Sequence, residues 1–163
     1  MMREIHLSNG GITLVDDDDY DVLNKYKWRK EASGYVFRTG SIKGRNVPVR
    51  MHRVVMEAPK GLQVDHINGN KLDNRKENLR LATRSENQRN VGKRSSNKSG
   101  YKGVRWVPSP YNKWRVDIRT DEGKKFIGHF NNILEAAKAY NDAALNYHGE
   151  FANLNEIREE DVS

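Results

Sequence analysis

Hydrophobic and polar positions alternate along the first third of the chain and predict short strands rather than long helices. The runs GITLV, GYVFRTG and NVPVRM have the two-residue period of half-buried strands. One short helix should interrupt them, because Asp16 to Asp19 precede YDVLNKYKW and carboxylates favour the positive end of a helix dipole. Four consecutive aspartates could also form a cation site, but a capped and solvated helix start explains them better.

The middle of the chain predicts a helix, a hairpin and a second helix. MHRVVMEA is a short amphipathic helix that ends before Pro59, and GLQVDHINGN has the alternation of a hairpin strand. The dipeptide Asn68-Gly69 predicts a two-residue turn, which the polar loop KLDNRKENLRL follows. Thr83 to Glu86 form a capping box, so a helix should begin there and run to about Val91. The predicted order is strand, turn, strand, loop and helix.

After the small, polar and basic run VGKRSSNKSG, the pattern predicts a second unit. YKGVRWV, KWRVDIR and KKFIGHF are typical of three strands, and NILEAAKAYNDAALNYHGE of a helix that stops at Gly149. One side of this helix carries small and aromatic residues, which would let it pack closely on the sheet: Ala136, Ala137, Tyr140, Ala144 and Tyr147.

The net charge of the chain indicates a polyanionic binding partner. Lys and Arg number 29 against 22 Asp and Glu, and a net charge of +7 favours a polyanion. Residues 84–105 contain one acidic side chain, so this segment is the best candidate for contacts to a phosphate backbone, although a solvated linker explains its charge equally well. Its seven basic side chains are Arg84, Arg89, Lys93, Arg94, Lys98, Lys102 and Arg105.

Other classes are made less probable by what the sequence lacks. No apolar run reaches membrane-spanning length, and MMREIHLSNGG lacks the apolar centre of a secretory signal, so we expect no membrane partner. We expect a cytoplasmic protein. The chain has no cysteine, so any metal must be bound by oxygen or imidazole ligands.

Asp65 and His66 are the candidate chemical groups. Phosphodiester hydrolysis needs an activated water and relief of negative charge on the phosphate; a neutral imidazole can provide the first and a hard divalent cation the second. Neighbouring side chains of a strand point to opposite sides, so the two could act jointly only if the hairpin bends or another element closes over one side. The capped helix is a candidate for that element, because Asn87 in its first turn offers an amide oxygen.

Residues 51–90, MHRVVMEAPKGLQVDHINGNKLDNRKENLRLATRSENQRN, resemble the HNH nuclease motif of phage and intron homing endonucleases. In that family a hairpin and a helix clamp one divalent metal, the ββα-metal arrangement. The resemblance implies that Asp65 and Asn87 bind one Mg²⁺ or Mn²⁺ ion and that His66 is the general base. It also implies that the side chain of Asn78 holds the loop between hairpin and helix. Asn87 stands where many members carry His.

Several of these residues have a plainer explanation. Asn74 and Asn78 could serve local backbone bonds only. His52 matches a His of the helix that precedes the family motif, and we interpret it as structural or phosphate-contacting. The remaining histidines have no partner in the pattern, and we expect them on the surface: His6, His129 and His148.

Residues 99–155 resemble the AP2 DNA-binding domain through GVR, KWRVDIR, IGHF and EAAKAYNDAA. This resemblance implies a three-stranded antiparallel sheet packed on one helix, with the open face of the sheet in the major groove of DNA. Several positions depart from the plant pattern, so a base preference does not transfer. The implied DNA-facing residues are Lys102, Arg105, Tyr111, Lys113, Asp117, Arg119, Lys124 and Phe126.

Together these patterns predict an α+β chain with a nuclease domain at 1–92, a basic linker at 93–98, an AP2-like domain at 99–155 and a tail at 156–163. The expected activity is metal-dependent nicking or double-strand cleavage of double-stranded DNA at sites selected by the AP2-like domain. No required protein partner is evident, and a monomer would suffice, although the pattern leaves the oligomeric state open. A phage-encoded protein of this kind would act in the host cytoplasm. One alternative is a DNA-binding regulator with an inactive site, against which the retained Asp65, His66 and Asn87 argue. Another is an RNA-directed protein, against which the expected lack of exposed aromatic pairs argues.

Overall fold

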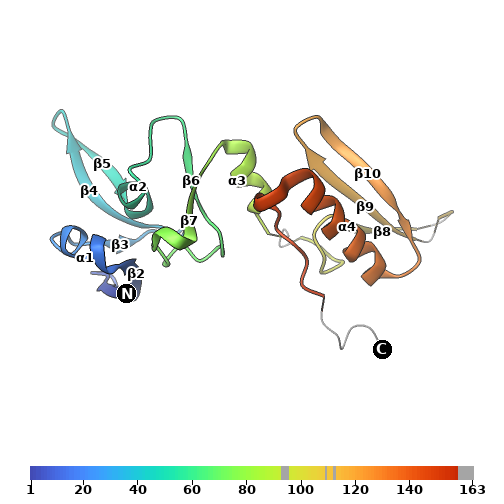
Figure 1. Ribbon diagram of the computed structural model, residues 1–163, viewed down its shortest axis with the longest axis horizontal. Coiled ribbons are helices and arrows are strands. Elements are labelled where there is room, and N and C mark those ends of the chain that lie inside the picture. Colours follow the sequence, from blue (N-terminus) through green and yellow to red (C-terminus); the bar gives the residue numbers. More distant parts are fainter. Residues whose placement is uncertain (93–95, 109, 112, 158–163) are drawn as a thin grey trace. The chain divides into compact units, whose positions relative to one another are not determined.

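The computed structural model describes residues 1–92, 96–108, 110–111 and 113–157 of the chain (Figure 1). Contacts divide the chain into two compact units, an N-terminal unit of Met1–Asn87 and a C-terminal unit of Gln88–Ser163. The predicted basic linker lies in the C-terminal unit, and its residues 93–95 lie outside the described part. Among the described residues, no helix is both long and apolar enough to span a bilayer.

The N-terminal unit is built from small antiparallel sheets and short helices, as the alternating pattern predicts. In chain order the elements are β1 (Met2–His6), β2 (Ile12–Asp16), α1 (Asp17–Leu23), β3 (Arg29–Lys30), β4 (Val36–Ile42), β5 (Arg45–Arg50), α2 (Met51–Val55), β6 (Gln63–His66), the 3₁₀ turn η1 (Lys76–Asn78), β7 (Leu79–Ala82) and α3 (Arg84–Asn90). β1 pairs with β2, β4 lies between β3 and β5, and β6 pairs with β7.

The core of this unit forms around Trp28. The indole is 1% exposed, and its Nε1 donates to the carbonyl oxygen of Leu23 at 2.8 Å, so the ring is buried without losing its hydrogen bond. Val15 of β2, Val36 of β4 and Met51 of α2 are fully buried in the same cluster. Ile5 of β1 and Leu79 of β7 belong to the same cluster, so the core joins elements from both ends of the unit.

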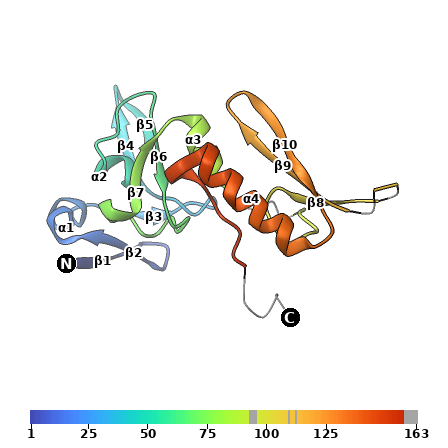
Figure 2. The same ribbon diagram turned by 45° about the vertical axis from the view of Figure 1, so that its right-hand side comes forward.

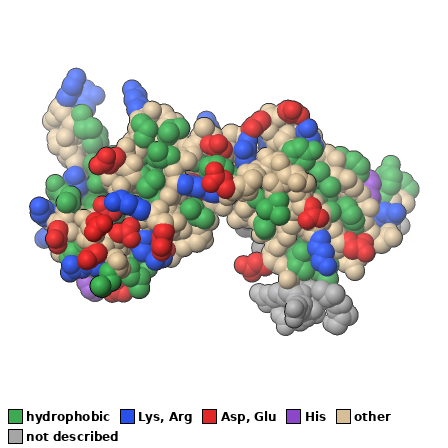
Figure 3. Space-filling model, viewed as in Figure 1, with side chains coloured by type: hydrophobic (Ala, Val, Ile, Leu, Met, Phe, Trp, Pro, Cys, Tyr) green, Lys and Arg blue, Asp and Glu red, His purple; other side chains and the backbone are tan. Residues whose placement is uncertain are grey.

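The aspartate run behaves as a helix start. Asp17 to Asp19 occupy the first turn of α1, and their neighbours are cations of the protein. Asp17 pairs with Arg3 at 3.4 Å and Asp19 with Lys76 at 2.9 Å. Acidic and basic side chains are accordingly interspersed on the face of this unit seen in Figure 3. The run therefore starts a helix, as the sequence favoured, and Asp17 and Asp18 are exposed. The expected cap does not form, because Asp16 makes no side-chain cap bond, and Asp19 is only partly solvated, because its Oδ2 is buried.

The predicted two-residue hairpin turn is wrong. Asn68-Gly69 does turn, with Gly69 at φ +73° and its amide bonded to the carbonyl oxygen of His66, but the chain does not return there. The partner strand is β7, which lies in the stretch predicted as loop, and residues 67–78 connect β6 to it. Asn68-Gly69 correctly indicated a turn, but it did not indicate which strand pairs with β6. That strand is β7, whose side chains Leu79 and Ala82 are buried.

The C-terminal unit has the three strands and the helix that its sequence predicts. β8 (Val104–Val107), β9 (Lys113–Thr120) and β10 (Gly123–Phe130) form an antiparallel sheet in the order β10-β9-β8. α4 (Ile133–His148) crosses one face of it (Figure 2), and the 3₁₀ turn η2 (Gly149–Phe151) follows. The core contains Val104, Val116, Ile118, Ala136, Tyr140, Ala143 and Ala144.

Alanines let α4 approach the sheet, as predicted from its small face. Ala136, Ala137 and Ala144 are 0% exposed. Tyr147 does not share their burial, since it is 46% exposed and receives the Lys125 ammonium 5.2 Å from its ring centroid. The helix begins with Asn132, whose side chain accepts from the amide of Leu134 at 2.7 Å.

We predict that Gly103→Ala strongly destabilises the protein. Gly103 has φ +75°, and a Cβ there would lie 2.1 Å from Cδ2 of Tyr140 and 2.8 Å from the carbonyl oxygen of Asp117. Backbone strain and overpacking together should lower the free energy of unfolding by about 3–5 kcal/mol in urea titrations. Gly100→Ala is the matched control, because Gly100 has φ +81° but nothing within 4 Å of its Cβ position. Equal losses of unfolding free energy in the two variants would show that the clash with Tyr140 contributes nothing.

Candidate active site

Asp65 is buried against a cross-strand arginine. The β6–β7 register sets Asp65 opposite Arg80, and the Asp65 carboxylate is 5% exposed. Its Oδ2 accepts from Nε of Arg80 at 2.9 Å and from Nη2 at 2.8 Å. A carboxylate at this depth requires a compensating positive charge. The carboxylate therefore favours a neighbouring cation, and in this structure that cation is the guanidinium of Arg80.

Helix α3 brings Asn87 to the strand face that carries Asp65. The capping box forms as predicted: the amide of Thr83 donates to Glu86 Oε2 at 2.7 Å, and the amide of Glu86 donates to Thr83 Oγ1 at 3.3 Å. Asn87 Nδ2 then donates to Gln63 Oε1 at 2.6 Å. Gln63 and Asp65 are two residues apart in β6 and so share a face of the strand. Asn87 and Asp65 are thus on one side of the hairpin.

This pair has the chemistry of a hard-cation site. Asp65 offers carboxylate oxygen, and Asn87, whose amide nitrogen is turned to Gln63, offers amide oxygen; both suit Mg²⁺ or Mn²⁺. The described residues contain no group of three or more His, Cys, Asp or Glu side chains that could hold an ion. A metal that took Asp65 and Asn87 as ligands would keep other coordination positions for water and phosphate oxygens.

His66 has a separate set of contacts. Its Nε2 lies 3.2 Å from Oδ1 of Asn74, and its ring centroid lies 5.3 Å from that of His52 and 5.9 Å from that of Tyr35. Burial lowers the pKa of His66 below its ordinary value, against the opposing effects of the Asn74 hydrogen bond and the Asp65 charge. The imidazole is therefore held neutral near pH 7, the state that a general base needs.

His52 is a buried neighbour of this site. The ring is 5% exposed in α2, packed between His66 and Tyr35. Burial, followed by the charges of His66, Arg50 and Arg53, lowers the pKa of His52 to about 3. Of the two roles considered for His52, the packing fits the structural one.

Asn78 braces the loop that connects β6 to β7. Its Oδ1 accepts from the amide of Asn68 at 3.0 Å, and its Nδ2 donates to the carbonyl oxygen of Asp73 at 2.8 Å. The resemblance placed this loop between the hairpin and the helix, whereas the structure places it inside the hairpin. These contacts hold backbone rather than substrate, so Asn78 is a positioning residue in this geometry.

The sequence suggested only local backbone bonds for Asn74, yet this residue links three elements. It is 0% exposed, bonded through its side chain to His66 and Thr13 and through its amide to the carbonyl oxygen of Leu14 at 2.8 Å. A polar residue without exposure is normally fixed by such bonds. Asn74 lies in the polar stretch KLDNRKENLRL, and local composition does not show which residue of such a stretch is buried.

The open face of the C-terminal sheet carries a charge cluster around Asp117. This carboxylate is 7% exposed and pairs with Arg115 at 2.8 Å, Lys124 at 3.2 Å and Arg105 at 3.5 Å. Burial alone would raise the pKa of Asp117, but the hydrogen bonds from Arg115 and Lys124 hold it below its ordinary value. Asp117 therefore organises three cations on this face. The sequence had identified all of them except Arg115.

Aromatic rings lie on the same face, contrary to expectation. The rings of Tyr111 and His129 stack with centroids 5.2 Å apart, and Phe126 lies 4.9 Å from His129. Tyr111 is 58% exposed and Phe126 is 51% exposed. The expected lack of exposed aromatic pairs is therefore wrong, and His129 has partners that the sequence did not indicate. His148 is also not at the surface: it is buried, and its Nε2 donates to the carbonyl oxygen of Arg119 at 2.8 Å.

The remaining predicted DNA contacts lie in different surroundings. Arg84, Arg119 and Lys124 are exposed, Lys113 is half-buried and Arg89 pairs with Asp121. Lys102 donates its ammonium to the carbonyl oxygens of Arg89 at 2.7 Å and Val91 at 2.5 Å, and burial lowers its pKa to about 8. Its DNA contact stays a prediction, as do the others. Lys93 and Arg94 lie outside the described residues.

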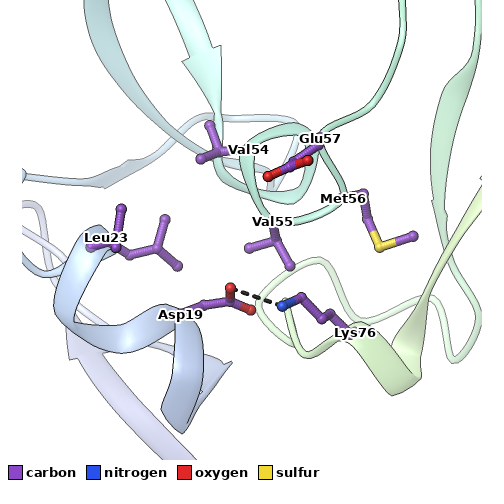
Figure 4. A pocket seen from close by; sticks show the side chains of 8 residues that line it. Asp19, Leu23, Val54, Val55, Met56, Glu57 and Lys76 are labelled. Carbon is purple, nitrogen blue, oxygen red and sulfur yellow. Dashed lines mark hydrogen bonds and ion pairs between the residues drawn. The ribbon is translucent and has the colours of Figure 1, made fainter.

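A pocket in the N-terminal unit contains none of the predicted site residues (Figure 4). It lies between α1 and α2, and the Asp19–Lys76 ion pair borders it. The other lining residues are Val22, Leu23, Val54, Val55, Met56 and Glu57. Its lining has two carboxylates, Asp19 and Glu57, but no histidine that could act as a general base. The Asp65 hairpin, which has such a histidine beside it, therefore remains the candidate site.

Comparison with known proteins places the hairpin and helix in a family. A family model described as HNH endonuclease matches residues 49–89. An uncharacterized HNH endonuclease of Acanthamoeba polyphaga mimivirus is 32% identical over 154 residues, which cover 91% of this chain and 76% of that protein. Protein 3.8 of Escherichia phage T7 is 38% identical over 110 residues, or 64% of this chain and 89% of that protein. No solved structure matches significantly. The likeness to the mimivirus protein extends over most of both chains, and with the β6–β7–α3 segment matched by the family model it shows that this chain belongs to the HNH endonuclease family.

Proposed function

We propose that the protein is a metal-dependent DNA endonuclease whose N-terminal unit hydrolyses phosphodiester bonds and whose C-terminal unit selects the site. The observation that carries this proposal is the Asn87–Gln63 hydrogen bond, which brings an amide side chain to the strand face of Asp65. An oxygen pair beside a neutral histidine is what metal-assisted hydrolysis needs.

Each residue of the N-terminal site has a distinct task. Asp65 and Asn87 would hold one Mg²⁺ or Mn²⁺ ion, which offsets negative charge on the phosphate. His66 takes a proton from the attacking water as the oxygen of that water bonds to phosphorus. The bond to the leaving oxygen breaks, and solvent water protonates that oxygen. Asn78 keeps the loop after His66 in place through its bonds to the backbone of Asn68 and Asp73.

The C-terminal unit supplies contacts that the nuclease site lacks. Its cationic face around Asp117, together with the resemblance to AP2 domains, supports binding to double-stranded DNA. Phosphate contacts by Arg119 and Lys124 of this unit, together with Arg84 of the N-terminal unit, would give a salt-dependent affinity. A monomer with one site fits nicking as the elementary reaction.

A second candidate is cleavage of single-stranded nucleic acid, RNA included. The stacked Tyr111–His129 pair and the neighbouring Phe126 favour it, because exposed rings stack on unpaired bases. Duplex DNA, single-stranded DNA and RNA of one sequence, offered at equal concentration, separate the two candidates by which is cut fastest. A regulator with an inactive site would bind duplex DNA and cut none of the three.

We predict that the protein nicks supercoiled plasmid in Mg²⁺ or Mn²⁺ and that EDTA stops the reaction. His66→Ala should lower the rate by about 10²–10⁴-fold, since a positioned general base contributes that much. His6→Ala is the control, because His6 is an exposed histidine on β1. Gel densitometry of nicked product measures both variants. An undiminished rate in His66→Ala would remove the base role.

We predict that Arg80 competes with the metal for Asp65. Without metal, Arg80→Met should lower the free energy of unfolding by about 3 kcal/mol, because it removes the guanidinium that offsets a buried carboxylate. Mn²⁺ would replace that charge, so Mn²⁺ should raise the Tm of Arg80→Met more than that of the wild type. Calorimetry with and without Mn²⁺ measures the difference, and adding Asp65→Asn should abolish it. Equal Mn²⁺ shifts in the wild type and in Arg80→Met would refute competition.

We predict that Arg119→Ala weakens DNA binding and makes it less sensitive to salt. Arg119 is exposed on the open face of β9, and loss of one phosphate contact should reduce the slope of log affinity against log salt by about 1. Fluorescence anisotropy of a labelled duplex at several salt concentrations measures the slope. Lys138→Ala is the matched control, because it removes an exposed charge from α4 on the other side of the sheet. The same slope change in both variants would mean that the sheet face has no special role.

A further inference from the structure

The side chains of Thr13, Asn74 and His66 form a buried chain of hydrogen bonds. Thr13 and Asn74 are both 0% exposed. Asn74 Nδ2 lies 2.9 Å from Thr13 Oγ1, and Asn74 Oδ1 lies 3.2 Å from His66 Nε2. The chain joins β2, the loop between β6 and β7, and the end of β6, elements that are far apart in the sequence.

The direction of each hydrogen bond follows from Thr13. Its hydroxyl donates to the carbonyl oxygen of Leu72 at 2.8 Å, with the sulfur of Met51 at 3.9 Å as a weaker acceptor. Either way the single hydroxyl proton is used, so Oγ1 is the acceptor for Asn74. The carbonyl oxygen of Lys71 lies 3.4 Å from Asn74 Nδ2 and requires a donor on the same side. Thr13 Oγ1, the nearer acceptor at 2.9 Å, therefore turns the nitrogen of Asn74 toward itself and the oxygen of Asn74 toward His66, and the Lys71 carbonyl at 3.4 Å is a weaker second acceptor.

The side-chain oxygen of Asn74 can accept a hydrogen bond from the His66 ring only if the facing ring nitrogen, Nε2, carries a proton. His66 must then carry its proton on Nε2, and in a neutral imidazole the basic lone pair is on the other nitrogen, Nδ1. We infer that Asn74, oriented by Thr13, is a positioning residue that holds His66 in the Nε2–H tautomer, so that Nδ1 accepts the proton of the attacking water. This inference rests on the base role proposed for His66.

The backbone strengthens this arrangement from the side of β2. The amide of Leu14 donates to the carbonyl oxygen of Leu72, and the amide of Asn74 donates to the carbonyl oxygen of Leu14, each at 2.8 Å. The loop is thereby fixed to the first hairpin of the chain, which precedes the segment that matches the family model. Residue 13 thus contributes to a site whose other members lie between residues 65 and 87.

The tautomer is measurable by NMR in the full chain. Long-range ¹H–¹⁵N correlation at pH 8, above the ordinary histidine pKa of about 6.5, distinguishes Nε2–H from Nδ1–H, and His66→Gln assigns the signal. We expect Nε2–H in the wild type. Nδ1–H in the wild type overturns the inference. The tautomer itself is determined in the unsubstituted protein, and the variant serves only to assign the signal.

Thr13→Val and Thr13→Ser form a matched pair. Valine has the shape of threonine without the hydroxyl, so Thr13→Val should allow both tautomers of His66 and lower kcat for duplex cleavage by about 10–100-fold, as loss of an outer-shell partner does. KM should not change, and Thr13→Ser should restore both the tautomer and kcat. A Thr13→Val protein with wild-type tautomer and kcat would overturn the inference.

Failure of this inference differs from failure of the proposed function. If His66 is not the base, His66→Ala keeps its cleavage rate, so the inferred role of Asn74 in catalysis is overturned together with the base role. If only the positioning is wrong, His66→Ala is inactive while Thr13→Val cuts as fast as the wild type.

Discussion

The pairing of β6 with β7 sets the geometry on which the candidate site depends. Its register puts Asp65 opposite Arg80, so a buried carboxylate meets a positive charge within the hairpin itself. The same register leaves Gln63 two residues from Asp65, where it receives the side chain of Asn87. A slip of one residue would turn Asp65 and Gln63 to the other face of the strand and separate them from the helix.

Asp65 and His66 are neighbours in sequence but belong to different surroundings. Alternation along β6 gives Asp65 the face that meets α3, while His66 contacts Asn74, His52 and Tyr35. The surroundings of Asp65 suit a cation, and the surroundings of His66 keep its imidazole neutral. A single strand thus separates the charge-binding group from the proton-accepting group while keeping them adjacent.

Much of this arrangement was predictable from local sequence, and the exceptions have physical causes. The capping box, the aspartate-rich helix start and the alanine face of α4 depend on contacts within one or two turns, so short-range patterns identified them. The partner of β6 was mispredicted because Asn68-Gly69 indicates a turn whatever strand follows. Asn74, Arg115 and His129 were missed because their importance comes from partners distant in sequence or on another strand. The sets of DNA-facing and metal-binding residues remain predictions.

The bonds between the loop and β2 bear on how small a working nuclease can be. The family model spans residues 49–89, and all four residues implied by the resemblance lie within it. Thr13 and the backbone of Leu14 do not, yet they fix the loop that contacts His66. A fragment trimmed to the family match would retain the reactive groups without their brace, so transplanting this motif to another scaffold would require a substitute for the first hairpin.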